Sequence, residues 1–288
     1  MEILHDVDMS AYTSFKAGGR AAEMVMPQTV DELVEALNMC LDEKKKFLLL
    51  GRGTNILIKD SGYSGLIVKP SENLEMIEVS GEKMKCGCGA YMKNVAREAL
   101  NNELSGFEFA SGIPGSIGGA LFMNAGAYGG EMKDIVVSAE AFSLEQRKII
   151  TVPLEDMALS YRHSVFQETA DVITSVTIEL RPGKKEYISA MMRELMEKRN
   201  AKQPVQYPCA GSFFKRPKGY FAGKLIEEAG LKGCTVGGAQ VSELHAGFII
   251  NKGGATATDI IDLMHEVQKG VMTKFGVRLE PEVRIIGD

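Results

Sequence analysis

Two glycine-rich segments of this 288-residue chain could hold an anion through backbone N–H groups. The first, Gly51–Asn55, follows the apolar run Phe47–Leu50, and its glycines would let peptide donors approach an anion closely. Thr54 and Asn55 add short hydrogen-bonding side chains. This first glycine segment could therefore cradle a diphosphate, while a tight turn between two strands would explain it as well.

The second glycine segment, Gly112–Gly130, favours the ligand interpretation. Eight of the chain's 31 glycines fall within Gly106–Gly130, and the apolar residues between them indicate a buried loop. Buried backbone donors need partners, and a bound ligand would supply them. A glycine-rich structural crossover is the alternative. Together the two segments predict a dinucleotide site.

Three polar side chains farther along could carry chemistry. Arg162 lies among aromatic neighbours in Tyr161–Phe166, and its guanidinium group could hold a carboxylate or stabilise an oxyanion. Ser212 precedes two phenylalanines and two cations, and without a histidine nearby it fits a proton donor better than a nucleophile. Glu282 shares one face of an alternating strand with Arg284. An ordinary surface arginine, a capping serine and a solvated strand face are the corresponding structural alternatives.

Other functions are disfavoured by composition and by failed motifs. A net charge of −5 without a long basic run argues against nucleic-acid binding. Gly219–Leu225 is one residue short of a phosphate-binding loop, and the first glycine segment lacks the third glycine of a Rossmann fingerprint. Four scattered histidines and five cysteines without zinc spacing predict no metal site. The acidic start and short apolar runs predict a soluble, cytoplasmic protein with no membrane insertion.

The elements that must position these residues alternate along the chain. Hydrophobic spacing and capping signals predict helices at Asp31–Asp42, Met92–Asn101, Tyr187–Asn200, Phe221–Ala229 and Asp259–Phe275, the last with Thr258 at its start. Strands are predicted at Phe47–Leu50, Ile56–Ile58, Leu66–Val68, Leu74–Val79, Lys83–Cys88, Ile135–Ser143, Val172–Leu180, Ala246–Asn251 and Leu279–Ile286. A turn-rich break at Arg181–Lys185 is a candidate domain boundary.

In this order the motifs resemble the UDP-N-acetylenolpyruvoylglucosamine reductase family, from about Thr13 to Gly287. Thr13–Gly19 and the two glycine segments are similar to those of the wider vanillyl-alcohol-oxidase-type FAD proteins, so they indicate the cofactor. Tyr161–Phe166, Gly211–Pro217 and Leu279–Gly287 are similar to the reductase itself.

The resemblance implies an α+β protein with a vanillyl-alcohol-oxidase/PCMH-type FAD-binding fold in two lobes, 1–69 and 70–183, and a C-terminal α/β substrate-binding domain, 184–288. It implies an NADP-dependent flavoprotein oxidoreductase with tight, non-covalent FAD. NADPH reduces the flavin, and UDP-N-acetylglucosamine enolpyruvate is then reduced to UDP-N-acetylmuramate. The implied process is peptidoglycan synthesis in the cytoplasm, and through it cell-wall biogenesis, cell shape, cell division and the cell cycle.

The resemblance also assigns roles to residues. Arg162, Ser212 and Glu282 match the catalytic set. The expected cofactor contacts are Gly51, Arg52, Gly53, Thr54, Asn55, Ile113, Pro114, Gly115, Ser116, Gly118, Gly119, Asn124 and Gly126. Lys215, Arg216 and Lys224 are expected at the UDP diphosphate, with Tyr161, Gln240 and Asn251 as further polar contacts.

The chemistry of the reaction fits these three side chains. Hydride added to the outer vinyl carbon sends charge into the neighbouring carboxylate, where Arg162 can stabilise it, and Ser212 can protonate the inner carbon. Glu282 could donate a hydrogen bond as a neutral acid or orient another donor. We favour a raised Glu282 pKa, because two ionised carboxylates in contact repel.

The chain resembles the short form of the family, which lacks an inserted loop whose tyrosine covers the substrate. Another FAD oxidoreductase on this scaffold, such as an alcohol or sugar oxidase, is the competing enzyme, and an inactive flavin-binding protein is the non-enzyme alternative. The catalytic set argues against both. The sequence does not specify the oligomeric state.

Overall fold

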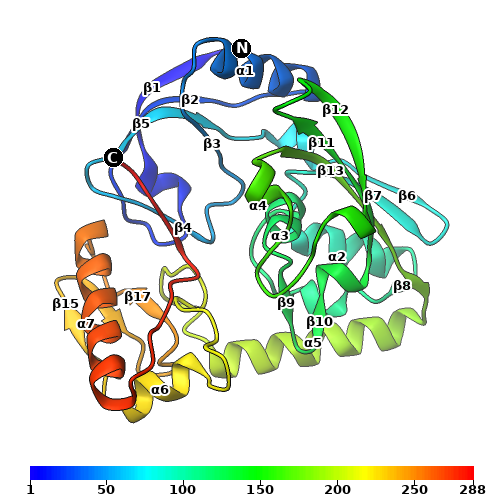
Figure 1. Ribbon diagram of the computed structural model, residues 1–288. Coiled ribbons are helices and arrows are strands. Elements are labelled where there is room, and N and C mark those ends of the chain that lie inside the picture. The colour runs from blue at the N-terminus through cyan, green and yellow to red at the C-terminus, as the bar shows by residue number, and fades with distance from the viewer. The chain divides into compact units, whose positions relative to one another are not determined.

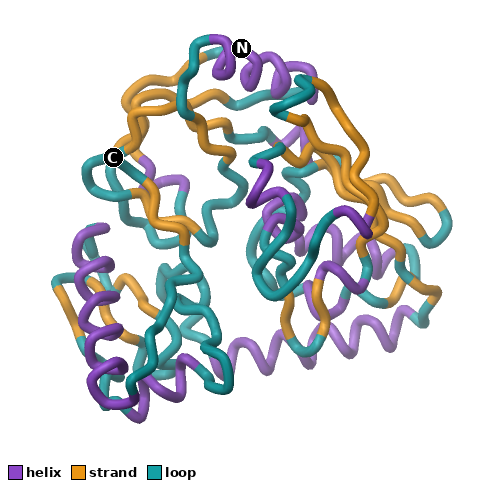
Figure 2. The backbone as a smooth tube through the Cα atoms, in the orientation of Figure 1, coloured by secondary structure: helices purple, strands orange, loops and turns teal.

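The computed structural model describes residues 1–288, which divide into two compact units. The first unit comprises Met1–Ile3, Met24–Arg52 and Leu66–Arg199, and the second comprises Leu4–Glu23, Gly53–Gly65 and Asn200–Asp288. Both contain helices and strands (Figure 1, Figure 2), as the α+β prediction requires. The predicted division at 69/70 and 183/184 concerns ligand binding and stays a prediction.

The elements are as follows. The helices are α1 (Val30–Asp42), α2 (Met92–Asn101), α3 (Ile117–Phe122), α4 (Phe166–Thr169), α5 (Lys185–Lys202), α6 (Ala222–Glu228) and α7 (Ala257–Phe275). The strands are β1 (Ile3–Asp8), β2 (Arg20–Val25), β3 (Phe47–Leu49), β4 (Ile56–Ile58), β5 (Tyr63–Val68), β6 (Ile77–Ser80), β7 (Lys83–Gly87), β8 (Leu104–Ser105), β9 (Gly126–Ala127), β10 (Gly130–Glu131), β11 (Val136–Ser143), β12 (Lys148–Pro153), β13 (Val172–Glu179), β14 (Arg181–Pro182), β15 (Thr235–Val236), β16 (Ala239–Val241), β17 (Ile249–Asn251) and β18 (Arg284–Ile286). None of the helices is both long and apolar enough to cross a membrane.

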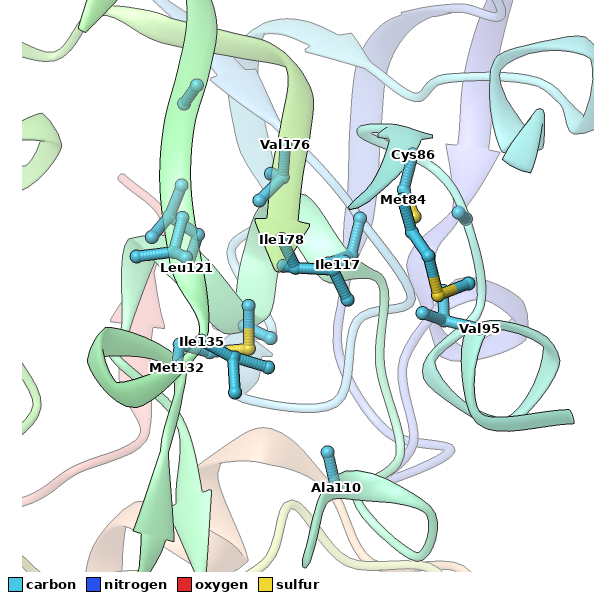
Figure 3. Packing of buried hydrophobic residues seen from close by; sticks show 14 of the residues in the cluster. Met84, Cys86, Val95, Ala110, Ile117, Leu121, Met132, Ile135, Val176 and Ile178 are labelled. Atoms are coloured by element: carbon cyan, nitrogen blue, oxygen red, sulfur yellow. The ribbon is translucent and has the colours of Figure 1, made fainter. Parts of the chain in front are cut away.

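The first unit is built on a five-stranded antiparallel sheet with the strand order β12-β11-β13-β7-β6. Its central strand, β13, is buried on both faces along most of its length, and α3 packs against β13 and β7. Val176 of β13 lies opposite Cys86 of β7, and both belong to a core that includes Ile117 of α3 and Val95 of α2 (Figure 3). The sheet therefore fixes α3, which lies inside the second glycine segment and contains Gly118 and Gly119.

A second core in the first unit forms around α1. Leu33 and Leu37 lie four residues apart on one helix face and are fully buried with Val68 of β5. β5 pairs in parallel with β3. The Thr29 hydroxyl accepts the Glu32 N–H at 3.1 Å, which caps the N-terminus of α1, and the Glu32 carboxylate accepts the Gln28 N–H at 2.7 Å.

The second unit packs α7 against a three-stranded antiparallel sheet, β15-β16-β17, and against α6 (Figure 1). Leu263, Val267 and Val271 repeat every four residues along α7 and are fully buried in its core. β18 pairs in parallel with β4, with Arg284 opposite Ile56. This pairing holds the C-terminal strand beside the segment that follows Gly53–Asn55.

Several predicted boundaries were wrong. α7 begins at Ala257, because Thr256, not Thr258, forms the capping box with Asp259. In the segment predicted as the strand Leu279–Ile286, only Arg284–Ile286 is a regular strand. Arg181–Pro182 is not a turn but a short strand that pairs with Leu104–Ser105.

Asp60 anchors the N-terminus of α7 from a distant part of the second unit. Its carboxylate accepts the Ala257 and Thr258 N–H groups at 2.9 and 2.7 Å and the Thr258 hydroxyl at 2.6 Å. Burial raises the pKa of Asp60, but the hydrogen bonds from Thr258 and Ala257 lower it more, so the net pKa lies below the ordinary value. The folded state therefore favours the ionised carboxylate.

Asp60→Asn is expected to lower the free energy of unfolding by about 1 kcal/mol at neutral pH, because the amide nitrogen cannot accept one of the two N–H groups and the negative charge at the helix N-terminus is lost. Because the folded pKa is depressed, this stabilisation is present above the unfolded pKa of about 3.9 and is lost as pH falls through the folded value. Urea titrations followed by circular dichroism should show the difference at neutral pH and a smaller one in acid. Asp262→Asn, an exposed position on α7, is the control. Equal stability of Asp60→Asn and wild type at neutral pH would contradict the assignment.

Candidate functional site

The two glycine segments meet within the first unit at Gly51 and Ser116. A Cβ atom on Gly51 would lie 2.6 Å from the Ser116 Oγ, so a larger residue would displace the Ser116 hydroxyl from this position. Ser116 caps α3, and its hydroxyl accepts the Gly119 N–H at 3.4 Å. The sequence predicted both segments as one site, and the structure brings these two residues into contact.

Some backbone N–H groups near Gly51 and Ser116 are hydrogen-bonded within the protein, and others are not. Ile117 and Gly118 donate to the Ala90 and Cys88 carbonyls at 2.9 and 3.1 Å. The N–H groups of Gly51, Gly115 and Ser116 make no hydrogen bond within the protein, although Gly115 and Ser116 are buried. The loop is thus partly a structural crossover, and its remaining donors suit a diphosphate.

Gly51→Ala is expected to weaken FAD binding, because the added methyl group would displace the Ser116 hydroxyl that caps α3. Gly51 is not among the residues with positive φ, so alanine adds no backbone strain there. The measurement is flavin content after purification. The double variant Gly51→Ala, Ser116→Ala removes the overlapping oxygen and should recover flavin, because the next Ser116 atom, Cβ, lies 3.8 Å away. Full flavin content in the single variant would refute this account.

The rest of the first glycine segment, Gly53–Asn55, belongs to the second unit. Gly53 has φ +62, and a Cβ there would lie 2.1 Å from the Tyr12 carbonyl oxygen, so glycine is required. The Gly53 carbonyl accepts the Ser14 N–H at 3.0 Å. The Ser14 hydroxyl is buried and has no hydrogen-bond partner in the protein. Such an orphaned group marks a position where a ligand atom would be stabilising.

Arg52 has protein partners for its guanidinium group. It pairs with the Glu75 carboxylate and lies over the Tyr91 ring, 4.5 Å from its centroid. Lys93 lies 4.7 Å from the same centroid. The predicted contact between Arg52 and the cofactor stays a prediction, and the structure gives the side chain a role in holding the loop.

Asn124 and Gly126 serve the internal geometry of the second glycine segment. The fully buried Asn124 amide donates to the Glu131 carboxylate at 2.6 Å and to the Ser160 carbonyl at 2.9 Å, and its oxygen accepts the Lys133 N–H. A Cβ on Gly126 would lie 2.6 Å from the Gly130 carbonyl oxygen. Both residues therefore shape the β9–β10 hairpin, and their cofactor contacts stay predictions. Of the other residues predicted at the cofactor, Ile113 is half-buried and Pro114 is exposed.

Arg162 lies in a tight turn of the first unit. Ser160 and His163 exchange backbone hydrogen bonds, and Arg162 adopts φ +57, an uncommon conformation for a non-glycine residue. The Gln167 side-chain amide donates both to the Arg162 carbonyl at 3.0 Å and to the Phe122 carbonyl at 2.8 Å. Since Phe122 ends α3, the turn that carries Arg162 is tied to the helix that begins at Ser116.

Ser212 and Glu282, 70 residues apart in sequence, are joined through one residue of the second unit. The Glu282 N–H donates to the Phe213 carbonyl at 2.8 Å, and Phe213 follows the exposed Ser212. The Phe213 ring is fully buried and packs edge-on against Phe15. The Asn55 amide donates to the Glu282 carbonyl at 3.2 Å. One cluster in the second unit thus holds two predicted catalytic residues and the end of the first glycine segment.

The predicted diphosphate ligands are cations in the second unit. Lys215 lies in the segment beside Ser212, and its N–H donates to the Glu280 carbonyl at 2.9 Å. The exposed Arg216 lies over the Phe221 ring at 4.7 Å. The exposed Lys224 pairs loosely, at 3.6 Å, with Glu228 one turn along α6. Lys215 pairs as loosely with Glu280, at 3.9 Å, and because the ion pairs of Lys215 and Lys224 are long and solvated, both lysines could exchange partners for a phosphate at small cost.

The three further polar contacts predicted for the substrate, Tyr161, Gln240 and Asn251, differ in their surroundings. The Asn251 amide is buried, donates to the Phe15 carbonyl at 2.9 Å and accepts the Gly253 and Ala255 N–H groups. The Gln240 amide donates to the Gly233 carbonyl and the Thr235 hydroxyl. Tyr161 is half exposed, with Arg162 over its ring. Substrate contacts for all three stay predictions, and Asn251 and Gln240 already have structural uses.

Sequence reasoning missed Ser14 and Gln167. Ser14 lies in Thr13–Gly19, which was recognised as a motif without a role for its hydroxyl. Gln167 directly follows Tyr161–Phe166, but an amide that bridges two carbonyls leaves no periodic signal. None of the five cysteines forms a disulfide, and burial raises the pKa of Cys86 and Cys88 to about 12, so these two thiols are inert core residues.

Two family models match the chain. Residues 21–152 match an FAD binding domain, and residues 203–286 match the C-terminal domain of UDP-N-acetylenolpyruvoylglucosamine reductase. Among full-length relatives, the UDP-N-acetylenolpyruvoylglucosamine reductase of Clostridium botulinum is 47% identical over 287 residues, which cover 100% of this chain and 94% of the relative. That of Caldanaerobacter subterraneus is 48% identical over 280 residues, 97% of this chain and 92% of the relative.

Solved structures agree with these matches. The UDP-N-acetylenolpyruvylglucosamine reductase of Thermus caldophilus superposes with a TM-score of 0.85 at 32% identity, covering 99% of this chain and 98% of that one. Cholesterol oxidase from Brevibacterium sterolicum shares the fold alone, with a TM-score of 0.50 at 16% identity over 63% of this chain and 37% of its own. The fold is therefore α+β, of the vanillyl-alcohol-oxidase/PCMH FAD-binding type with an added C-terminal domain. By sequence and by structure, the chain belongs to the UDP-N-acetylenolpyruvoylglucosamine reductase family.

Proposed function

We propose that this chain reduces UDP-N-acetylglucosamine enolpyruvate to UDP-N-acetylmuramate with NADPH and FAD, in the cytoplasmic synthesis of peptidoglycan precursors. The observation that carries the proposal is 47% identity, along the whole chain, to a UDP-N-acetylenolpyruvoylglucosamine reductase. The joined positions of Ser212 and Glu282 support it, because an intact catalytic pair argues against an inactive flavin-binding protein.

The residues at the glycine segments fit FAD. Gly51, Gly115 and Ser116 of the first unit would present peptide N–H groups to the diphosphate. Bound FAD would take hydride from NADPH and deliver it to the outer vinyl carbon of the substrate. The protein supplies binding, orientation and charge stabilisation around that transfer.

Arg162 stabilises the negative charge that the hydride sends into the substrate carboxylate. Its contribution grows as the charge develops, which lowers the barrier without tightening ground-state binding. The turn held by Gln167 fixes the backbone from which the Arg162 side chain extends, so little backbone freedom is lost when the substrate binds.

Ser212 donates the proton that completes the reduction at the inner carbon. A hydroxyl is a weak acid, but the carbon acceptor is strongly basic. Glu282 donates a hydrogen bond to the substrate carboxylate or orients a donor to it. The half-buried Lys215 and the exposed Arg216 and Lys224 neutralise the diphosphate of the UDP group.

Product analysis tests the proposal. Incubation of the FAD-loaded protein with NADPH and UDP-N-acetylglucosamine enolpyruvate, without oxygen, should give a product two hydrogens heavier. One NADPH should be consumed per product. NADPH oxidation that depends on oxygen and ignores the enolpyruvyl sugar would instead support an oxidase on the same scaffold.

A further inference from the structure

His245 lies in the loop between β16 and β17 of the second unit, and none of the roles described above involves it. The loop is tight, because the buried Ser242 hydroxyl accepts the Leu244 and His245 N–H groups at 3.2 and 3.3 Å. The His245 Nδ1 atom accepts the Gly247 N–H at 3.1 Å. This bond places the ring proton of the neutral histidine on Nε2.

The half-buried His245 ring fills a slot that two glycines leave open. A Cβ on Gly247 would lie 3.0 Å from the ring, and a Cβ on Gly223 of α6 would lie 3.2 Å from it. The ring also packs edge-on against Phe248, with centroids 5.0 Å apart. Backbone and side chain are therefore shaped to hold the imidazole in one place.

From Gly247 a chain of hydrogen bonds leads to the catalytic pair. The Gly247 carbonyl accepts the Phe213 N–H at 2.8 Å, and the Phe213 carbonyl accepts the Glu282 N–H at 2.8 Å. Glycine has the most freedom of any residue, so a hydrogen bond to its N–H restricts it strongly. On the other side of Ser212 lies Gly211, with φ +74 and no atom within 4 Å of an added Cβ, so the Phe213 side fixes Ser212.

We propose that His245 is a positioning residue, whose Nδ1 fixes Gly247 and, through Phe213, holds Ser212 and Glu282 in their working positions. The inference rests on the proposed function for the roles of Ser212 and Glu282, and on the hydrogen bonds alone for the positioning.

The role requires a neutral imidazole, since a protonated Nδ1 donates and cannot accept. Burial lowers the pKa of His245 below its ordinary value, nearby Lys232 lowers it further, and the histidine's own backbone and Glu227 oppose the shift. Glu227 extends from α6 and Lys232 from the turn after it, and the two pair at 3.0 Å. The neutral form thus prevails at neutral pH and gives way in acid.

Two substitutions separate positioning from simple packing. Asparagine can accept the N–H two residues onward through its Oδ1 atom, as in an Asx turn, whereas phenylalanine fills the slot without an acceptor. In His245→Phe, substrate-driven reoxidation of the reduced flavin should slow by about 10- to 100-fold, the effect of misplacing a catalytic group. Flavin reduction by NADPH should not change. His245→Asn should retain most of the wild-type rate, and His265→Asn, at an exposed position on α7, all of it.

The pH profile and hydrogen exchange complete the test. Wild-type reoxidation should fall in acid as one group protonates, and His245→Asn should lack this acidic limb. Independently of any reaction, the amides of residues 211–215 should exchange faster in His245→Phe but not in His245→Asn. Equal rates for wild type and His245→Phe, an equally impaired His245→Asn, or unchanged exchange would overturn the proposal. A wild-type flavin that the enolpyruvyl sugar cannot reoxidise would refute the proposed function instead, and exchange would still decide the positioning.

Discussion

Ser212→Ala is expected to leave flavin reduction by NADPH intact and to slow substrate-driven flavin reoxidation by about 10²–10⁴-fold, the usual contribution of a positioned general acid. The Ser212 side chain is exposed, and its neighbour Phe213 keeps both backbone hydrogen bonds in the variant, so the fold should not change. Stopped-flow absorbance of the flavin separates the two half-reactions.

Ser212→Cys provides the matched comparison, because a thiol keeps a transferable proton at the same position. The rate of substrate-driven flavin reoxidation in Ser212→Cys should lie between those of wild type and Ser212→Ala. If alanine slows both half-reactions equally, Ser212 shapes the site as a whole and is not the proton donor. If it slows neither, another group supplies the proton.

Arg162→Ala is expected to lower the rate of the second half-reaction by about 10²–10³-fold, as removal of one oxyanion donor does in other enzymes. Arg162→Lys should recover only part of this loss, because an ammonium group keeps the charge but not the two-pronged geometry. Substrate concentration dependence then distinguishes a loss in kcat from a loss in KM.

Arg193→Ala, at an exposed arginine of α5, controls for the loss of one positive charge from the first unit. It should match wild type in both half-reactions. A pure KM effect in Arg162→Ala would mean that the guanidinium binds the ground state and the developing charge equally well.

Local signals made much of the fold predictable. The helix at Met92–Asn101 was predicted with its observed bounds, because its apolar spacing is regular and its buried residues all lie on one face. At α7 the choice of Thr258 as the start was wrong, because the capping box is formed by Thr256 and Asp259. Alternation in Leu279–Ile286 predicted a strand, yet most of that segment has only isolated partners, such as Phe214 opposite Pro281.

The site depended on contacts that no local pattern reveals. Glycine composition identified the two segments, but it could not show which glycines contact the other segment. Gly51 lies against Ser116 of the second segment, whereas Gly126 lies against the Gly130 carbonyl within its own segment. Asn124 and Asn251 were predicted as ligand contacts because their side chains are polar. In the structure their side-chain amides donate hydrogen bonds to protein atoms. The link from His245 to Glu282 needs three segments brought together by the tertiary fold.

The central claim is tested most directly by following the flavin of the purified protein through one cycle without oxygen. NADPH should bleach the yellow flavin band, and UDP-N-acetylglucosamine enolpyruvate added after removal of NADPH should restore it fully. A colourless protein that binds no FAD, or a bleached flavin that recovers its colour only in oxygen, would contradict the account.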